Sequence, residues 1–252
     1  MGVYASGRAM WGAACMLMLC SPSGAACFNS APLTKSSPRS AWQDLETFRA
    51  DKSLNPLIQQ VQTVDGGVGN YNRDYWEITF RPVVGQTPQS VLADLRAGFG
   101  SIVFRRAPMG KFQGYDAANR AKWMSEKPLG AVMTFVLMDV VDLVDFEQGS
   151  VVVSCASDTD WIFSTVTTAK DGVHPVAGNR GFAVRANADG TMSVVVKAVD
   201  RIVDAQPYAA AEAGIYFAGE LIWKGMMANL RQRYKYLMPK RPIGFSLPRT
   251  PN

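Results

Sequence analysis

The chain has 252 residues, 48% of them apolar, which is enough for a sizeable core and favours one large domain over two. Its 26 basic and 21 acidic residues give a formal net charge of +5, with no basic stripe interleaved with aromatic residues, so nucleic-acid binding is not predicted. A single histidine and four scattered cysteines exclude a multi-histidine or cysteine-based zinc site, and no phosphate-binding glycine fingerprint is present, so we predict no metal and no cofactor.

The first 26 residues have the build of a secretory signal peptide. Arg8 precedes an apolar run from Ala9 to Leu19, and the small residues from Ser21 to Ala26 supply a cleavage region. The run is too short to cross a bilayer, which needs about 20 apolar residues. We therefore predict a signal peptide over 1–26 and an exported protein that is periplasmic, anchored at the outer membrane, or secreted.

Cys27 directly follows Ala25–Ala26, and here the N-terminus resembles bacterial lipoprotein precursors, in which a small residue precedes the cysteine that is lipidated. Gly24 stands where that family usually has leucine, so cleavage by the ordinary signal peptidase is the alternative. The resemblance implies lipidation of Cys27, with membrane contact only through that lipid. The residues 27–40 are rich in serine and proline and are predicted to form a flexible spacer.

Two cysteines remain after the signal peptide, and they allow two interpretations. If Cys27 is lipidated, Cys155 is a lone buried thiol that behaves as a small hydrophobic residue. In an oxidising compartment the two could instead pair. Because Cys27 is predicted to lie in a flexible segment and Cys155 in an apolar strand, the pattern favours the unpaired thiol over the disulfide.

Residues 41–238 are predicted to form a single α+β domain. Thr87 followed by Pro88 is a good helix start, a cap residue with proline at the first position. Tyr75 to Val83 alternates between apolar and polar residues and predicts a strand. In chain order, the first half is predicted to contain a helix, a strand, a helix, a short strand and a helix, over 41–50, 75–83, 87–100, 102–104 and 117–125.

The second half of the domain is predicted to be an antiparallel meander. Short segments rich in valine, phenylalanine and threonine are separated by polar breaks at hairpin distances. These segments are 131–138, 150–157, 161–168, 181–186 and 192–199. In the last hairpin, Phe182 and Val184 share one side of the strand.

One long helix is predicted over 208–237, between Pro207 and Pro239. At about 100° per residue its apolar residues fall on one side. They are Ile215, Ile222, Trp223, Met226, Leu230, Tyr234 and Leu237. Residues 239–252 are rich in proline and are predicted to form an extended tail.

The element order over about 71–237 resembles the helix-grip architecture of START-like and pollen-allergen-like lipid-binding proteins, although no residue motif supports the match. We therefore predict an α+β fold in which an antiparallel sheet of about six strands packs against the long C-terminal helix. A closed β-barrel or a sandwich with the helix outside is the alternative. The resemblance implies a cavity between sheet and helix that often holds an apolar ligand.

This fold suggests an exported envelope protein that binds an apolar or amphipathic small molecule without catalysis. Arg180 precedes the inward-facing strand residues with the same parity, and its planar guanidinium could anchor a carboxylate or phosphate head group, or pair with an acidic neighbour. The same apolar residues could equally be a filled core. The candidate ligand-binding residues are Phe182, Val184, Ile215, Ile222, Met226, Leu230 and Arg180.

Two other functions stay open. The chain could be a membrane-tethered structural or interaction protein with an envelope protein partner. It could also be an enzyme built on His174, the only side chain here that ordinarily titrates near neutral pH. The conceivable partners for that histidine are Ser154, Ser164, Asp171 and Asp200, but no Gly-x-Ser-x-Gly elbow supports a nucleophile.

Overall fold

The computed structural model describes residues 25–105, 110–137, 148–203, 212–234 and 242–248, so nearly all of the predicted signal peptide lies outside the described residues. Nine described strands form one antiparallel sheet in the order β3-β4-β5-β6-β7-β8-β2-β9, and β1 pairs with β6 beside this path. The strands are β1 (Gln60–Val61), β2 (Val68–Phe80), β3 (Gly110–Gly114), β4 (Val132–Leu137), β5 (Gln148–Ala156), β6 (Asp160–Thr167), β7 (Val176–Ala186), β8 (Met192–Ile202) and β9 (Ile243–Ser246).

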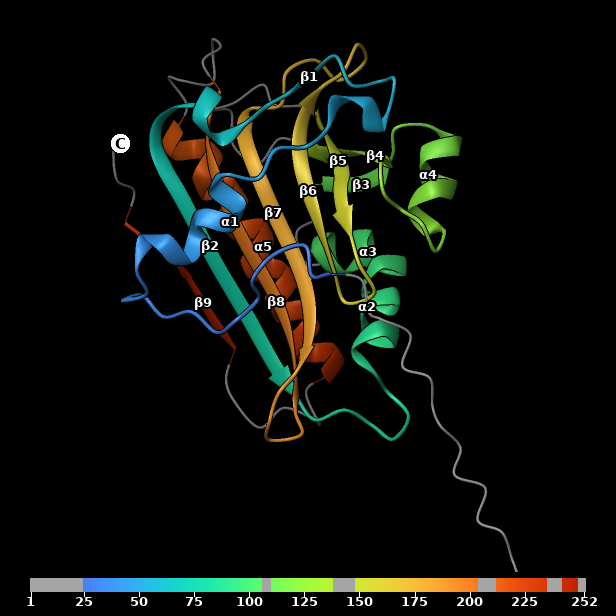
Figure 1. The fold of residues 1–252 in the computed structure, drawn as a ribbon, viewed down its shortest axis with the longest axis vertical. Helices are drawn as coiled ribbons and strands as arrows, with labels where there is room; N and C mark the ends of the chain where they lie inside the picture. Colours follow the sequence, from blue (N-terminus) through green and yellow to red (C-terminus); the bar gives the residue numbers. More distant parts are fainter. Residues whose placement is uncertain (1–24, 106–109, 138–147, 204–211, 235–241, 249–252) are drawn as a thin grey trace, which may run out of the picture.

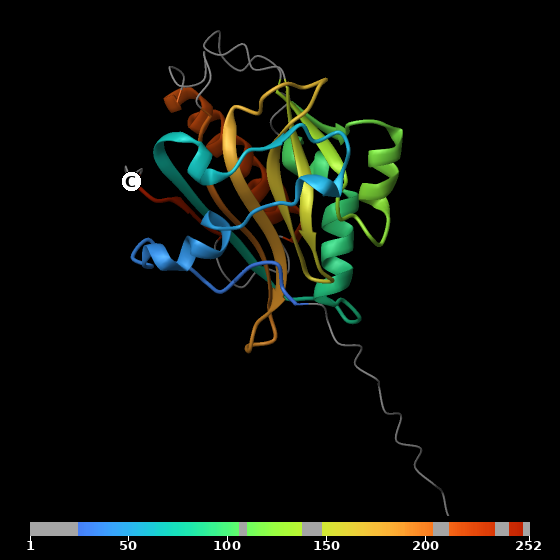
Figure 2. The same ribbon diagram turned by 45° about the horizontal axis from the view of Figure 1, so that its top comes forward.

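The helices lie on both faces of this sheet. The long helix α5 runs behind the sheet in Figure 1, and α1 lies in front of it; the turned view in Figure 2 shows the same arrangement. We call the face towards α5 the inner face and the opposite one the outer face. The described α-helices are α1 (Gln43–Glu46), α2 (Pro88–Ala97), α3 (Phe99–Phe104), α4 (Ala117–Met124) and α5 (Glu212–Tyr234).

The inner face and α5 share the main hydrophobic core, which confirms the predicted α+β fold with its sheet around a C-terminal helix. Phe182 and Val184 of β7 are buried in the same cluster as Met226 and Leu230 of α5. The ring of Phe99 lies near its centre and contacts several aromatic rings edge-on. These belong to Phe112, Trp123, Phe135, Trp161, Phe163 and Phe182. In the described residues the sheet is an open path from β3 to β9 rather than a closed barrel.

Helix α5 is continuous from Glu212 to Tyr234, and the predicted periodicity decides which side is buried. Trp223, Met226 and Leu230 are buried on the side that faces the sheet. The solvent side carries Lys224, which pairs with Glu220 four residues earlier. The predicted extensions of this helix into 208–211 and 235–237 lie outside the described residues.

The short strand predicted over 102–104 is wrong, because these residues belong to helix α3. Gly98 ends α2 and α3 begins at once, and Phe99, Ile102 and Val103 then recur at helical spacing on one buried side. A run of three apolar residues carries no period of its own, so tertiary packing on α5 decided its conformation.

The N-terminal segment covers the outer face instead of forming the predicted flexible spacer. Phe28 and Leu33 are buried in a second core together with Trp42 and Leu45. The apolar residues of this segment have partners because alternate sheet residues, such as Val195, point outwards. We call residues 27–48 the N-terminal strap.

Cys27, at the start of the strap, is bonded to Cys155 of β5. The predicted lipidation of Cys27 is therefore wrong for this structure, because the sulfur that would carry the lipid is already used in the disulfide. The sequence pattern does not favour this disulfide, because it predicts that residue 27 lies in a flexible segment. The burial of Phe28 instead holds it against the strand that carries its partner.

The proline-rich C-terminal segment also differs from the predicted extended tail. Within it, Ile243–Ser246 forms β9 and pairs with β2 at the edge of the sheet. The ring of Phe245 packs on Tyr75 on the outer face, with ring centroids 5.6 Å apart. A four-residue strand this close to prolines gives no recognisable alternation in the sequence.

Candidate functional site

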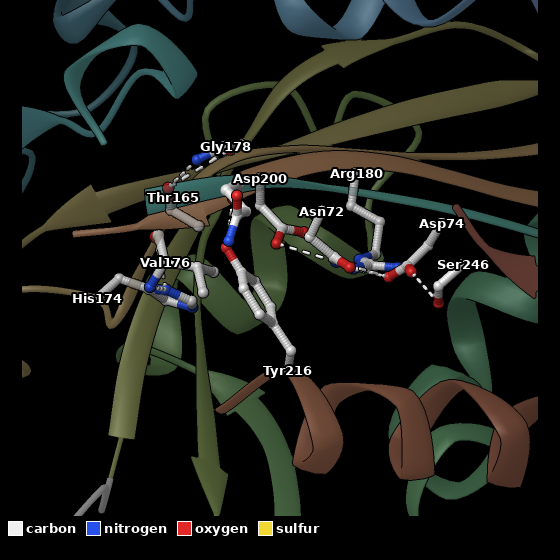
Figure 3. A network of polar contacts seen from close by, with 11 residues as sticks. Asn72, Asp74, Thr165, His174, Val176, Gly178, Arg180, Asp200, Tyr216 and Ser246 are labelled. Carbon is white, nitrogen blue, oxygen red and sulfur yellow. Dashed lines mark hydrogen bonds and ion pairs between the residues drawn. The ribbon is translucent and has the colours of Figure 1, made fainter. Parts of the chain in front are cut away.

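The inner face of the sheet changes from apolar to polar along its strands. In β7 the alternation that buries Val184 and Phe182 continues to Arg180, and in β2 the matching positions are Trp76, then Asp74. Every second residue of a strand lies on the same face, so these polar side chains point towards α5 like their apolar neighbours. We call this region the polar end. It comprises Asn72, Asp74, Arg180, Asp200 and Ser246 (Figure 3).

Arg180 is the centre of the polar end. Its Nη2 lies 3.2 Å from Oδ2 of Asp74 and 3.3 Å from Oδ2 of Asp200. Its guanidinium carbon also lies 4.2 Å from the ring centroid of Trp223 on α5, a cation–π contact. The ion pairing that the sequence left as one alternative for Arg180 is therefore present.

The two carboxylates are held by further hydrogen bonds. Asn72 donates from Nδ2 to Asp74 and to Asp200, at 3.1 Å each. Ser246 of β9 donates to the other oxygen of Asp74 at 2.6 Å. The polar end is thus a fixed network whose charged groups are one guanidinium and two carboxylates.

One donor of this network is left over. Nη1 of Arg180 is buried and has no hydrogen-bond partner among the described residues. A buried donor without an acceptor costs about 1–3 kcal/mol, which a bound group with an acceptor would recover. Oε1 of Glu212, in the first turn of α5, is likewise buried without a partner in the described part of the chain.

Beneath the polar end, the sheet-facing side of α5 carries a half-buried glycine, and no described atom lies where its side chain would project. Gly219 comes three residues after Tyr216 and four before Trp223, so it lies on the same side of the helix as these two buried rings. A Cβ atom built on Gly219 would meet no described atom within 4 Å, apart from the helix backbone and its own chain neighbours. We call this unfilled space the Gly219 gap.

The Gly219 gap has polar and apolar neighbours. Tyr216 reaches from α5 to the sheet, where its hydroxyl donates to the carbonyl of Asn70 at 3.1 Å (Figure 3). Trp223 lies on the other side of Gly219, under Arg180, and Phe163 is the neighbour of Arg180 in β6. Trp223 flanks Gly219 along the helix and also contacts the guanidinium of Arg180, so aromatic and cationic groups lie close together here, an arrangement that suits an amphipathic ligand.

His174 lies in the loop before β7, and its hydrogen bonds hold this loop in place. Its Nδ1 is 3.2 Å from the backbone nitrogen of Val176, and Gln62 bonds both its backbone nitrogen and its carbonyl oxygen. Burial, and after it the charge of Arg180, lowers the pKa of His174 to about 4, so the imidazole is neutral at pH 7.

The residues considered as partners of His174 have other hydrogen-bond partners. Ser154 and Ser164, the conceivable nucleophiles, hydrogen-bond to each other. Asp171 accepts from Thr134 and Ser150.

The predicted ligand-binding residues separate into two groups. Phe182, Val184, Met226 and Leu230 are completely or almost completely buried in the filled part of the core. The half-buried Ile215 and Ile222 belong to the first half of α5, where Gly219 also lies.

Sequence reasoning identified Arg180 but missed the residues that hold it at the polar end. Asp74 and Asn72 precede the segment predicted as a strand, so their alternation with Trp76 is easily overlooked. A glycine in a helix, such as Gly219, is not by itself a sign of a site. Its place between Tyr216 and Trp223 on the sheet-facing side is the signal that the sequence offers.

No protein-family model matches this chain, and no curated protein shows significant similarity to it. Among solved structures, the chain is similar to Ara h 8.0201 with 11% identity and a TM-score of 0.36, over 61% of this chain and 95% of that one. At this level of similarity no property of that protein is transferred to this chain.

Two further findings concern the described residues. None of their helices has both the length and the hydropathy needed to cross a membrane. Within the same residues, no group of three or more histidine, cysteine, aspartate or glutamate side chains is placed to hold a metal ion.

Proposed function

We propose that this chain is an exported, non-catalytic binding protein that holds an amphipathic small molecule between helix α5 and the polar end of the sheet. The Gly219 gap carries this proposal, because no described atom lies within 4 Å of a Cβ on Gly219, while the buried rings of Tyr216 and Trp223 flank it on the same side of α5. Arg180 would bind the polar group of the ligand through Nη1, and Trp223 and Tyr216 would contact its apolar part.

The proposed site is smaller than the cavity that the sequence suggested. Four of the predicted ligand-binding residues pack in the neighbouring core and would support the proposed site from below without contacting the ligand. They are Phe182, Val184, Met226 and Leu230. The remaining predicted residues, Ile215 and Ile222, are half-buried in the same half of α5 as the gap. Binding therefore needs no rearrangement of the filled core.

Export is supported by two observations. The N-terminus has the pattern of a signal peptide. The disulfide between Cys27 and Cys155 is a bond that persists in oxidising compartments and is rare in the cytosol. Because Cys27 is in the disulfide, we propose a product that carries no lipid on this residue.

The experiment fills the gap with a side chain. The Gly219→Leu variant is compared with Ala213→Leu, which adds a side chain to the exposed side of the same helix. Each protein is titrated with the uncharged fluorescent probe phenylnaphthylamine, and the purified wild type is examined for a retained ligand by native mass spectrometry.

We expect wild type and Ala213→Leu to bind the probe, and Gly219→Leu to bind at least about tenfold more weakly with its fold intact. Unchanged binding by Gly219→Leu would show that the site lies elsewhere. Absence of probe binding and of any retained mass in the wild type would contradict the proposed function itself.

A further inference from the structure

The charges at the polar end determine which ligand head group it can accept. Arg180 resembles an anion anchor, but its positive charge is already shared between the carboxylates of Asp74 and Asp200. Together these three groups carry one negative charge. A carboxylate or phosphate placed against Arg180 would meet two anions a few ångströms away, in a region largely shielded from water.

Among the described residues, the other charged groups near the polar end do not reverse this balance. Glu212 adds a further carboxylate at the start of α5, with Oε2 3.1 Å from where a Cβ on Gly69 would lie. His174 is neutral at pH 7 and brings no positive charge. The guanidinium of Arg201 bonds the carbonyl of Gly69 and lies over the ring of Tyr71, on the outer face.

Two buried atoms without hydrogen-bond partners among the described residues indicate which donors and acceptors the ligand head group should carry. Nη1 of Arg180 needs an acceptor, which an ammonium group cannot supply. A carbonyl or hydroxyl oxygen supplies one without adding charge. Oε1 of Glu212 needs a donor, and a hydroxyl or amide offers one as well.

We infer that the ligand is an uncharged amphipathic molecule whose carbonyl, amide or hydroxyl group bonds Nη1 of Arg180, and that the site excludes fatty acids, phosphates and other anions. This inference rests on the proposed function, since it names the class of molecule that the Gly219 gap takes. Asp74 and Asp200 are the residues that determine the selectivity, because they neutralise Arg180 before any ligand arrives.

The test compares head groups on one hydrocarbon chain. Decanol, decanamide, decanoate and decylammonium compete with phenylnaphthylamine for the wild-type protein at neutral pH. We expect decanol or decanamide to displace the probe at about tenfold lower concentration than either charged compound. Equal or tighter binding of decanoate would overturn the inference and leave the proposed function standing. Failure of every compound, with no probe bound, would instead contradict the proposed function.

Removing one carboxylate should change the selectivity in a predictable direction. In Asp200→Asn, the net charge of Arg180 and its carboxylate partners rises from −1 to zero, because only Asp74 remains, so decanoate should bind about tenfold more tightly than to wild type, with little change for decanol. Glu77→Gln is the matched control, since Glu77 pairs with Arg185 on the outer face of the same sheet. Asp74→Asn replaces Asp200→Asn if the latter does not fold. Unchanged selectivity in the folded variant overturns the inference.

Discussion

The ammonium nitrogen of Lys197 lies 2.7 Å from Oδ1 of Asp44, a residue 153 positions earlier in the chain. The Lys197 side chain is only 1% exposed, and it also donates to the carbonyl of Asn29 at 3.2 Å. Asn29 and Asp44 both belong to the N-terminal strap. The strap therefore covers this lysine and also supplies the counterion that its buried charge needs.

Removing that partner should destabilise the protein strongly. Asp44→Asn leaves Lys197 buried beside a neutral amide, and we expect it to lower the free energy of unfolding by about 3 kcal/mol in urea denaturation. The double variant Asp44→Asn/Lys197→Met should recover part of this loss, because no buried charge remains. A loss below about 0.5 kcal/mol would mean that the pair behaves like an exposed surface ion pair.

Opening the disulfide should loosen the strap from the sheet. Cys27 and Cys155 are 128 residues apart, so their bond closes a long loop of the unfolded chain. We expect the Cys27→Ala/Cys155→Ala variant to lose about 2–5 kcal/mol of stability, measured by guanidinium denaturation without reductant. Reduced wild type should behave like this variant. Equal stability of oxidised wild type and variant would contradict a structural role of the bond.

Acid should destabilise the fold through His174. Its pKa in the folded protein is about 4, below the ordinary value of 6.5, so the unfolded chain binds more protons between these pH values. The stabilising contribution is complete above pH 6.5 and is lost as the pH falls towards 4. From pH 7 to 5 the loss should be about 2 kcal/mol.

The His174→Asn variant isolates this effect, because an amide can hydrogen-bond near the Nδ1 position and does not titrate. Burial raises the pKa of Asp160, which acts in the opposite sense, and this contribution is common to both proteins. Urea denaturation at several pH values should therefore give a steeper loss for wild type than for the variant. Parallel curves would show that His174 protonates without cost to the fold.

Small additions at Gly219 should stabilise the protein. Alanine has a higher helix propensity than glycine, and its methyl group would enter the Gly219 gap without contacting a described atom. We expect Gly219→Ala to raise the free energy of unfolding by about 1 kcal/mol, measured by urea denaturation without ligand. By contrast, Gly244→Ala should lower the free energy of unfolding, because its Cβ would clash with the ring of Trp76. Destabilisation by Gly219→Ala would indicate that the gap is occupied.

The sequence predicted those parts of the fold that a local period determines. A helical period identified the buried side of α5, which carries Trp223, Met226 and Leu230. Alternation in β7 placed Phe182 and Val184 together on one face of the strand, which is the inner face of the sheet. Both signals arise within one element, so no knowledge of distant residues is needed.

The features that sequence reasoning missed depend on pairs of distant segments. The bond between Cys27 and Cys155 and the burial of Lys197 under Asp44 exist only because the strap lies across the outer face. A lysine in an alternating strand is normally exposed, and a serine-rich segment is normally flexible, so local patterns give no reason to expect either the buried ion pair or the docked strap. The candidate site has the same character, since Arg180 and Gly219 come from different elements.

Opposite ends of the chain close the two surfaces of the sheet. The strap is synthesised before the strands that it covers, and α5 is synthesised after them. The inner core cannot close until α5 has left the ribosome, so the apolar inner face stays open while the strands are synthesised. For the export that we propose above, this open chain is the form that a translocase threading unfolded substrates would accept.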